Sequence, residues 1–180
     1  MQETGLRIRV LGEAVLRRKA RPVKEVTDRH RALLSEMARV MYDAKGIGLA
    51  APQVGVSESM IVADTGTGLY KLVNVKITGK EGRQCMEEGC LSVPGVGVKV
   101  RRAKKVVVEA LDETGKAVSI PAEDLLACVF QHECDHLEGK LIVDYASLIG
   151  KIKIKKTVTR LLKKAHDGTV SPPKGKSGAL

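Results

Sequence analysis

Six consecutive residues in the second half of the chain carry the clearest chemical signal: Gln131-His132-Glu133-Cys134-Asp135-His136. Residues four apart lie one turn apart on the same face of an α-helix, so His132 and His136 can present two imidazoles to one ion. Glu133 follows the first histidine and is free to act as a base. This H-E-x-x-H pattern is typical of divalent-metal sites, and its alternative is a helix with two chance histidines.

A catalytic ion of this kind needs a third protein ligand and one open position. Two kinds of metalloprotease with H-E-x-x-H take this ligand from further along the chain, one from a histidine and the other from a glutamate. Both ligands are missing here, because position 142 is Ile rather than His and no glutamate follows Glu138. Upstream, Cys90 lies in a glycine-containing segment, and a thiolate with two imidazoles suits Zn(II), Fe(II), Co(II) or Ni(II). A single cysteine is more often a small buried apolar residue. The vacancy for a third ligand favours Cys90 as that ligand.

The composition bounds the kind of protein that positions these groups. The chain has 180 residues, of which 43% are hydrophobic and 29% charged, as in a globular domain with a sizeable core. Its apolar runs, such as 125–130, are too short to span a bilayer, and its first residues contain no apolar signal segment, so we expect a cytoplasmic protein without a membrane partner. The formal net charge of +10 favours anionic neighbours, whereas 2% aromatic residues disfavour a surface that stacks bases.

The spacing of apolar residues and of turn-forming residues predicts an α+β fold. We expect antiparallel β-sheets around a central helix that carries H-E-x-x-H, followed by a C-terminal helix. Residues 1–166 form a single catalytic domain in this interpretation, and the Pro-, Gly- and Lys-rich residues 167–180 form a disordered basic tail. The predicted helices cover residues 27–44, 121–137 and 147–165, and the predicted strands cover residues 60–63, 70–74, 105–111 and 116–120.

Three segments in order resemble the motifs of one known family, the peptide deformylases. They are Gly46-Ile47-Gly48-Leu49-Ala50-Ala51-Pro52-Gln53, Glu88-Gly89-Cys90-Leu91-Ser92 and the segment from Gln131 to His136. The resemblance extends from about Leu6 to Ser147. It implies an enzyme that hydrolyses the formyl group from N-formylmethionyl peptides and releases formate and a free amino terminus.

The resemblance implies a role for the matching polar residues. Cys90, His132 and His136 would hold one divalent ion, and Glu133 would be the general acid–base. The implied ion in the cell is Fe(II), and Zn(II), Ni(II) or Co(II) could occupy the same ligands. A metal ion lowers the pKa of its water towards about 7, which supplies the nucleophile that an amide requires.

The same resemblance places the substrate. The Gln53 side-chain amide and the Leu91 backbone N–H would donate hydrogen bonds to the formyl oxygen. Ile47, Gly48 and Gly89 would pair with the backbone of an extended peptide, which glycine permits because it lets another backbone approach closely. Taken alone, Gln53 would be an ordinary polar loop residue, and the motif around it reverses that interpretation.

The resemblance also implies roles for a methionine pocket and for an ion pair. Met86, Leu125 and Cys128 would line the pocket for the methionine side chain, and ordinary core packing is the equal alternative for Cys128. Asp135 and Arg102 would form an ion pair that steadies the metal-binding helix. His30 is expected at the surface.

The third predicted helix is strongly basic. A solvated face is the usual explanation of such a run. The functional alternative is docking on ribosomal RNA near the exit of the nascent chain, where a deformylase meets its substrate. The cations are Lys151, Lys153, Lys155, Lys156, Arg160, Lys163 and Lys164.

Three functions therefore compete. The first is a metal-dependent deformylase. The second is a metallopeptidase that shares H-E-x-x-H, which Ile142 and the absent downstream glutamate weaken. The third is a basic ribosome-binding module with a purely structural metal, in which Glu133 would have no chemical role.

Overall fold

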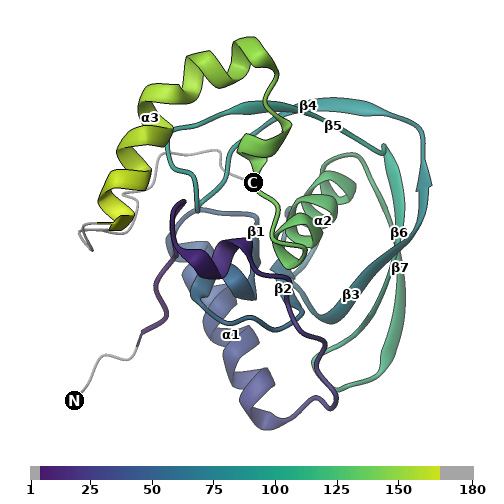
Figure 1. Ribbon diagram of the computed structural model, residues 1–180. Helices are drawn as coiled ribbons and strands as arrows, with labels where there is room; N and C mark the ends of the chain where they lie inside the picture. Colours follow the sequence, from purple (N-terminus) through teal and green to yellow (C-terminus); the bar gives the residue numbers. More distant parts are fainter. Residues whose placement is uncertain (1–4, 167–180) are drawn as a thin grey trace.

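The computed structural model describes residues 5–166, in which a run of six consecutive strands separates the first α-helix from the second and third, and the strand pairing is antiparallel (Figure 1). This arrangement confirms the predicted α+β class. The disordered tail predicted for residues 167–180 lies outside the described residues. The helical elements are, in chain order, η1 (Ala14–Arg17), α1 (Asp28–Asp43), η2 (Ala51–Val54), α2 (Asp124–Leu137), η3 (Ile142–Tyr145) and α3 (Leu148–His166), where η marks a short 3-10 helix.

The strands form one five-stranded and one two-stranded antiparallel sheet. The first has the order β1-β2-β3-β6-β7 and the second pairs β4 with β5. Because β3 leads directly into β4, and β5 into β6, the two sheets are the two ends of one long bent hairpin (Figure 1). The strands are β1 (Gly48–Ala50), β2 (Met60–Ala63), β3 (Tyr70–Glu81), β4 (Gln84–Glu88), β5 (Val98–Arg102), β6 (Lys105–Leu111) and β7 (Ala117–Glu123).

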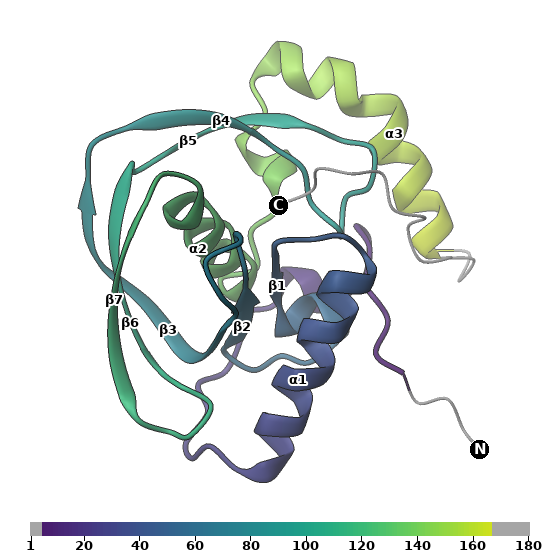
Figure 2. The same cartoon turned by 180° about the vertical axis from the view of Figure 1, so that it is seen from behind.

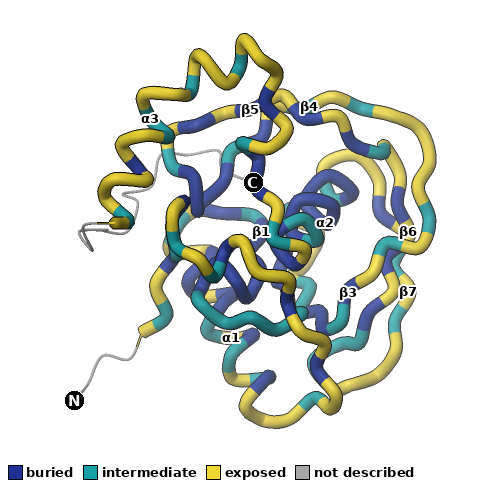
Figure 3. The backbone as a smooth tube through the Cα atoms, viewed as in Figure 1, coloured by how far each residue is buried: buried dark blue, intermediate teal, exposed yellow. Residues whose placement is uncertain are grey.

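Helix α2 lies in the space that this bent hairpin encloses, and both views show strands passing around it (Figures 1 and 2). Its tube is dark blue over most of its length, which marks buried residues (Figure 3). Phe130, Val129 and Ala127 are fully buried against strands β3 and β6, and the edge of Tyr70 contacts the Phe130 ring with centroids 5.4 Å apart. A helix held on so many sides is a rigid support for reactive groups.

Helices α1 and α3 cover the outside of this structure. Helix α1 buries Leu34, Met37 and Met41 against β1 and β2, as the spacing of its apolar residues predicts. Helix α3 buries only Leu161 completely and is otherwise mostly exposed, so it stands out in yellow (Figure 3). The β1–β2 region and α2 therefore share a core that does not include most of α3.

The structure corrects several local predictions. Pro121 does not open the second helix, because it lies in β7 opposite Val107, and a proline is tolerated there since β7 is an edge strand. The strand predicted at residues 70–74 is β3, which runs on to Glu81. The glycine-rich segment after Gly46 forms β1 and η2. His30 is buried rather than at the surface, where its Nδ1 atom accepts the Thr27 N–H at 3.0 Å.

Candidate metal centre and active site

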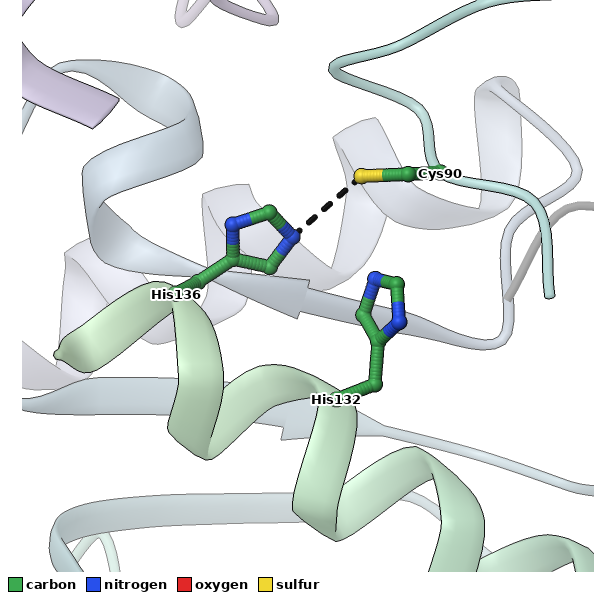
Figure 4. Close-up of side chains that lie close together, drawn as sticks. All are labelled: Cys90, His132 and His136. Carbon is green, nitrogen blue, oxygen red and sulfur yellow. Dashed lines mark hydrogen bonds between the residues drawn. The ribbon is translucent and has the colours of Figure 1, made fainter. Parts of the chain in front are cut away.

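Helix α2 and the segment after β4 bring three side chains with metal-binding atoms together. His132 and His136 project from consecutive turns of α2 towards Cys90, as Figure 4 shows. One ligand atom from each of the three residues lies within 4.8 Å of the others, and Cys90 Sγ is 3.3 Å from His136 Nε2. All three residues are buried, which keeps bulk water from competing for an ion.

The chemistry of these atoms fits a divalent ion. The His132 Nε2 atom is buried and finds no hydrogen-bond partner within the described chain. Such an orphaned nitrogen would cost stability unless something binds it. A tetrahedral ion with ligands at about 2.0–2.3 Å holds sulfur and nitrogen about 3.5 Å apart, close to the separation of Cys90 Sγ and His136 Nε2.

Glu133 points into the same site without touching a partner. Both of its carboxylate oxygens are buried and accept no hydrogen bond from residues 5–166. Burial raises the pKa of Glu133 to about 7, against the attraction of His132. A carboxyl group with such a pKa exchanges protons readily near neutral pH, which is what a general acid–base requires.

The glycines of the first motif let β1 approach this carboxyl group. A Cβ atom on Gly48 would collide with the carboxylate of Glu133 and would come within 2.9 Å of Val129 Cγ1. A Cβ atom on Gly46 would lie 2.8 Å from Leu91 Cδ1. These close approaches explain why glycine occupies both positions, independently of any contact with a substrate.

Gln53 lies in η2 with its amide turned towards the cysteine. Its Oε1 atom accepts the Ala50 N–H at 2.8 Å, which fixes the orientation of the amide. Its Nε2 atom donates to Ser92 Oγ at 3.2 Å and lies 3.7 Å from Cys90 Sγ. The Leu91 N–H donates to no acceptor in the part of the chain that the structure describes. Two N–H donors therefore flank the cysteine.

Glu88 is the residue of the site to which sequence reasoning assigned no role. It is completely buried, and its Oε2 atom accepts a hydrogen bond from His132 Nδ1 at 2.8 Å. Arg102 donates to both Glu88 oxygens at 2.8 and 2.9 Å. Burial alone would raise the pKa of Glu88, but the hydrogen bonds from Arg102 and His132 outweigh it and lower the pKa to about 2.

Arg102 also contacts Asp135, the partner expected for it from the resemblance. Its Nη1 atom lies 2.6 Å from Asp135 Oδ2, which also accepts the Tyr145 hydroxyl at 2.8 Å. The guanidinium lies over the Tyr145 ring, 5.0 Å from its centroid. The network from Tyr145 to His132 thus passes through one buried arginine. In the sequence, the only indication of a role for Glu88 is its place two positions before Cys90, in the motif Glu88-Gly89-Cys90-Leu91-Ser92.

The residues expected to contact a substrate lie beside β1, on β4 and the segment after it, and on α2. Ile47 is half-buried, and its carbonyl accepts the Asp64 N–H at 2.9 Å. Gly89 lies between the buried Glu88 and Cys90.

Met86 is half-buried against the core around α2, and Leu125 at the start of α2 is 36% exposed. Cys128 is fully buried with its Sγ 3.2 Å from Glu88 Oε1, so the thiol faces the glutamate network.

The fold and the site together define a metal-dependent hydrolase whose potential metal site groups Cys90 with the two histidines of H-E-x-x-H. The comparisons with known proteins give the family. Residues 6–151 match the family described as polypeptide deformylase. The chain belongs to the peptide deformylase family, whose members remove the formyl group from the N-terminal formylmethionine of newly synthesised polypeptides and release formate.

Individual relatives agree with this assignment. The chain is 53% identical over 148 residues to the peptide deformylase of Halothermothrix orenii, covering 81% of this chain and 96% of the relative. It is 52% identical over 136 residues to that of Desulfitobacterium hafniense, covering 76% and 91%. The crystal structure of peptide deformylase from Thermus thermophilus superposes with a TM-score of 0.84 at 39% identity, covering 88% of this chain and 98% of that one.

Within residues 5–166, no helix combines the length and the apolar character that crossing a bilayer requires. The mostly exposed α3 is the longest of these helices and carries seven lysines and arginines.

Proposed function

We propose that Cys90, His132 and His136 hold the catalytic ion of this deformylase and that Glu133 moves the proton during hydrolysis. The single observation that carries the proposal is the convergence of the three ligand atoms within 4.8 Å beside a buried, unpartnered carboxyl group. When bound, a divalent ion supplies Lewis acidity, which lowers the pKa of a water towards about 7 and polarises a carbonyl oxygen.

The chain's own residues supply the remaining chemistry. Glu133 takes a proton from the attacking water and passes it to the leaving nitrogen, for which a pKa of about 7 suits it. The Gln53 Nε2 and Leu91 N–H groups donate to the formyl oxygen as negative charge develops there. Each such donor contributes on the order of 3 kcal/mol to the stability of the transition state. Ala50 and Ser92 hold the Gln53 amide in place.

An extended peptide substrate fits between β1 and the segment that contains Gly89. Strand β1 is the end strand of its sheet, so one edge of its backbone is free to pair with a peptide at Ile47 and Gly48. We assign the methionine side chain to the region of Met86, Leu125 and Cys128. The exposure of Leu125 and the partial exposure of Met86 support an open wall for this pocket.

A comparison of Glu133→Gln with the natural protein tests the assignment. The variant keeps the shape of the side chain and its own bound metal, because Glu133 is not a ligand. We expect formate release from formyl-Met-Ala to fall at least 100-fold, while elemental analysis shows unchanged metal content. An unblocked Met-Ala-Ser peptide should remain uncleaved by either protein. Cleavage of that peptide would favour the metallopeptidase, and full activity of the variant would favour a structural metal.

We propose Fe(II) as the ion in the cell. A thiolate with two imidazoles binds Fe(II), Zn(II), Co(II) and Ni(II), and the resemblance to deformylases favours iron. Purification without oxygen followed by elemental analysis tests this, with iron expected in near-stoichiometric amount. Zinc in the anaerobic protein at the same occupancy would contradict the proposal.

We further propose that residues 1–166 form one catalytic domain that acts in the cytoplasm, with α3 docked on ribosomal RNA. The support for docking is that all seven cations of α3 are exposed. Deleting α3 would uncover the core around Leu161, so charge reversal is the sharper test. We expect Lys155→Glu, Lys156→Glu, Lys163→Glu and Lys164→Glu together to abolish co-sedimentation with ribosomes. Unchanged co-sedimentation would leave α3 as a solvated face.

A further inference from the structure

A cavity of about 680 Å³ lies on the side of α2 that faces away from the proposed metal ligands. Its walls come from Gln131, Cys134 and Asp135 on α2, from residues 75–80 of β3, and from Tyr145. Residues 131, 134, 135 and 138 lie three and four apart and so form a face of the helix different from that of His132 and His136. The mechanism proposed above uses no group that opens into this cavity.

One wall of the cavity is an unpaired strand edge. Strand β2 pairs with β3 only as far as Val73, and Asn74 donates its N–H to Ser59 O at 2.7 Å. Beyond that point β3 continues to Glu81 with β6 as its neighbour on the other side. Alternate residues of the stretch 75–80, which is interrupted by one register shift between Ile77 and Gly79, therefore present free N–H and C=O groups along the cavity. Such an edge is a template for a further strand.

The cavity also carries uncompensated positive charge. Its two carboxylates already have cationic partners, since Asp135 pairs with Arg102 at 2.6 Å and Glu138 pairs with Lys19 at 2.9 Å. Four more cations line it, and none of them pairs with a carboxylate within residues 5–166. These free cations are all exposed: Lys76, Lys80, Arg101 and Lys140.

The strand and the charges select the same kind of occupant. Lys76, Thr78 and Lys80 alternate with less exposed residues along β3, so the two lysines flank a neighbouring strand from one face. A second copy of β3 would place lysine against lysine, which disfavours self-pairing. A strand with acidic residues at alternate positions would instead place carboxylates opposite these lysines.

We propose that the free edge of β3 docks an acidic segment of a partner protein, bound as an extended strand between β3 and α2. The binding energy comes from main-chain hydrogen bonds to residues 75–80, and the preference for acids comes from Lys76, Lys80 and Lys140. The bound segment lies against Asp135 and Tyr145, and thus beside the network that reaches His132. The occupant is thus an acidic, extended segment of another protein rather than the formylated substrate.

The test uses the metal-loaded, full-length protein and the fluorescein-labelled peptide Glu-Val-Glu-Val-Glu amide. Fluorescence anisotropy at about 0.15 M salt, where distant charges are screened, gives the affinity. We expect Lys76→Ala, Lys80→Ala and Lys140→Ala combined to weaken binding at least tenfold. A matched control combines Lys24→Ala, Lys99→Ala and Lys116→Ala, which remove the same charge from exposed positions elsewhere, and it should bind normally. Formate release should be unchanged in both proteins.

Modified peptides separate strand pairing from simple charge attraction. The Gln-Val-Gln-Val-Gln peptide should bind at least tenfold more weakly. Successive N–H groups of a strand point to opposite edges, so the valine N–H groups of the peptide lie on one edge and the glutamate N–H groups on the other. N-methylation of the set that faces β3 should abolish binding, and N-methylation of the other set should not. Equal binding of both N-methylated peptides would overturn the proposal, as would equal losses in the two triple variants. Binding of oligouridylate but not of the peptide would assign the cavity to RNA and also overturn it.

Discussion

The Nδ1 atom of His132 lies 2.8 Å from Glu88 Oε2, and this contact orients the imidazole ring of a proposed metal ligand. A histidine that hydrogen-bonds a carboxylate through Nδ1 is left with Nε2 free to bind an ion, because the contact fixes both ring orientation and tautomer. Arg102 holds the carboxylate in turn by two hydrogen bonds. The position of one ligand therefore depends on a residue that touches no ion.

Replacing Glu88 by Gln should weaken metal binding without removing a ligand. The amide keeps the size of the side chain but carries no charge to attract the His132 N–H, so we expect a 10- to 100-fold loss of metal affinity. Competition with a chelator measures that affinity. Glu87→Gln is the control, because Glu87 is the exposed neighbour. Equal affinity in Glu88→Gln and the natural protein would show that the contact is dispensable.

Gly48→Ala should damage catalysis through Glu133. The added methyl group would collide with the Glu133 carboxylate and displace it, and a misplacement of about 1 Å can cost about 100-fold in rate. We expect kcat/KM for formate release to fall by one to two orders of magnitude, while the metal content stays constant. Gly5→Ala is the matched control, since a Cβ atom there meets nothing within 4 Å. An active Gly48→Ala enzyme would mean that the carboxylate can shift freely.

Arg102→Ala should destabilise the fold as well as the metal centre. Arg102 is 5% exposed at its side chain and Glu88 is fully buried, so the variant leaves a buried carboxylate without its partner. Breaking such a pair typically costs about 3–5 kcal/mol in the free energy of unfolding. Urea unfolding of the metal-loaded protein measures this cost, with the exposed neighbour in Arg101→Ala as control. If both stability and metal affinity were unchanged, the network would have no structural role.

The contribution of Asp144 to stability should disappear in acid. Burial alone would raise the pKa of Asp144, but Arg17, at 2.6 Å, and the Leu141 N–H, at 2.9 Å, lower it. A carboxyl group with a lowered pKa stabilises the fold above its unfolded pKa near 3.8, and this stabilisation is lost as the pH falls through the folded pKa. Since both side chains are partly exposed, we expect Asp144→Asn to cost less than about 1 kcal/mol at pH 7.

Urea unfolding at several pH values checks this expectation. The difference between the natural protein and Asp144→Asn should be present at pH 7 and should shrink steadily below pH 4. Glu25→Gln serves as the control, because the exposed Glu25 forms no ion pair within the described chain. A difference that stayed constant down to pH 3 would assign the effect of the substitution to packing rather than charge.

The sequence predicted the elements with strong periodic patterns and the residues within motifs. Helix α1 follows directly from the spacing of its apolar residues, and strand β2 from its β-branched residues and the turn signals around it. His132 and His136 share a face because of helix geometry alone. Assignments for Gln53, Leu91 and the glycines required the family resemblance, because isolated loop residues carry no periodic signal. Their catalytic and binding roles stay predictions.

The parts that sequence reasoning missed depend on contacts between distant segments. Strands β4 and β5 are short and mix charged with apolar residues, so their sequences carry no clear strand pattern. Only their pairing with each other defines them, in a ladder that extends from Gln84 opposite Arg102 to Glu88 opposite Val98. The role of Glu88 depends on Arg102 and His132, which other elements deliver. Likewise, Pro121 is a plausible start of a helix until β6 is known to lie beside it.

The separation of Cys90 from the α2 histidines has a consequence for biogenesis. A chain still being synthesised, with α2 not yet made, holds a solitary Cys90 side chain that cannot retain an ion by itself. The proposed set of ligands exists only when the hairpin has closed around α2. We therefore expect metal loading to follow folding, so that a newly made enzyme stays inert until its own architecture is complete.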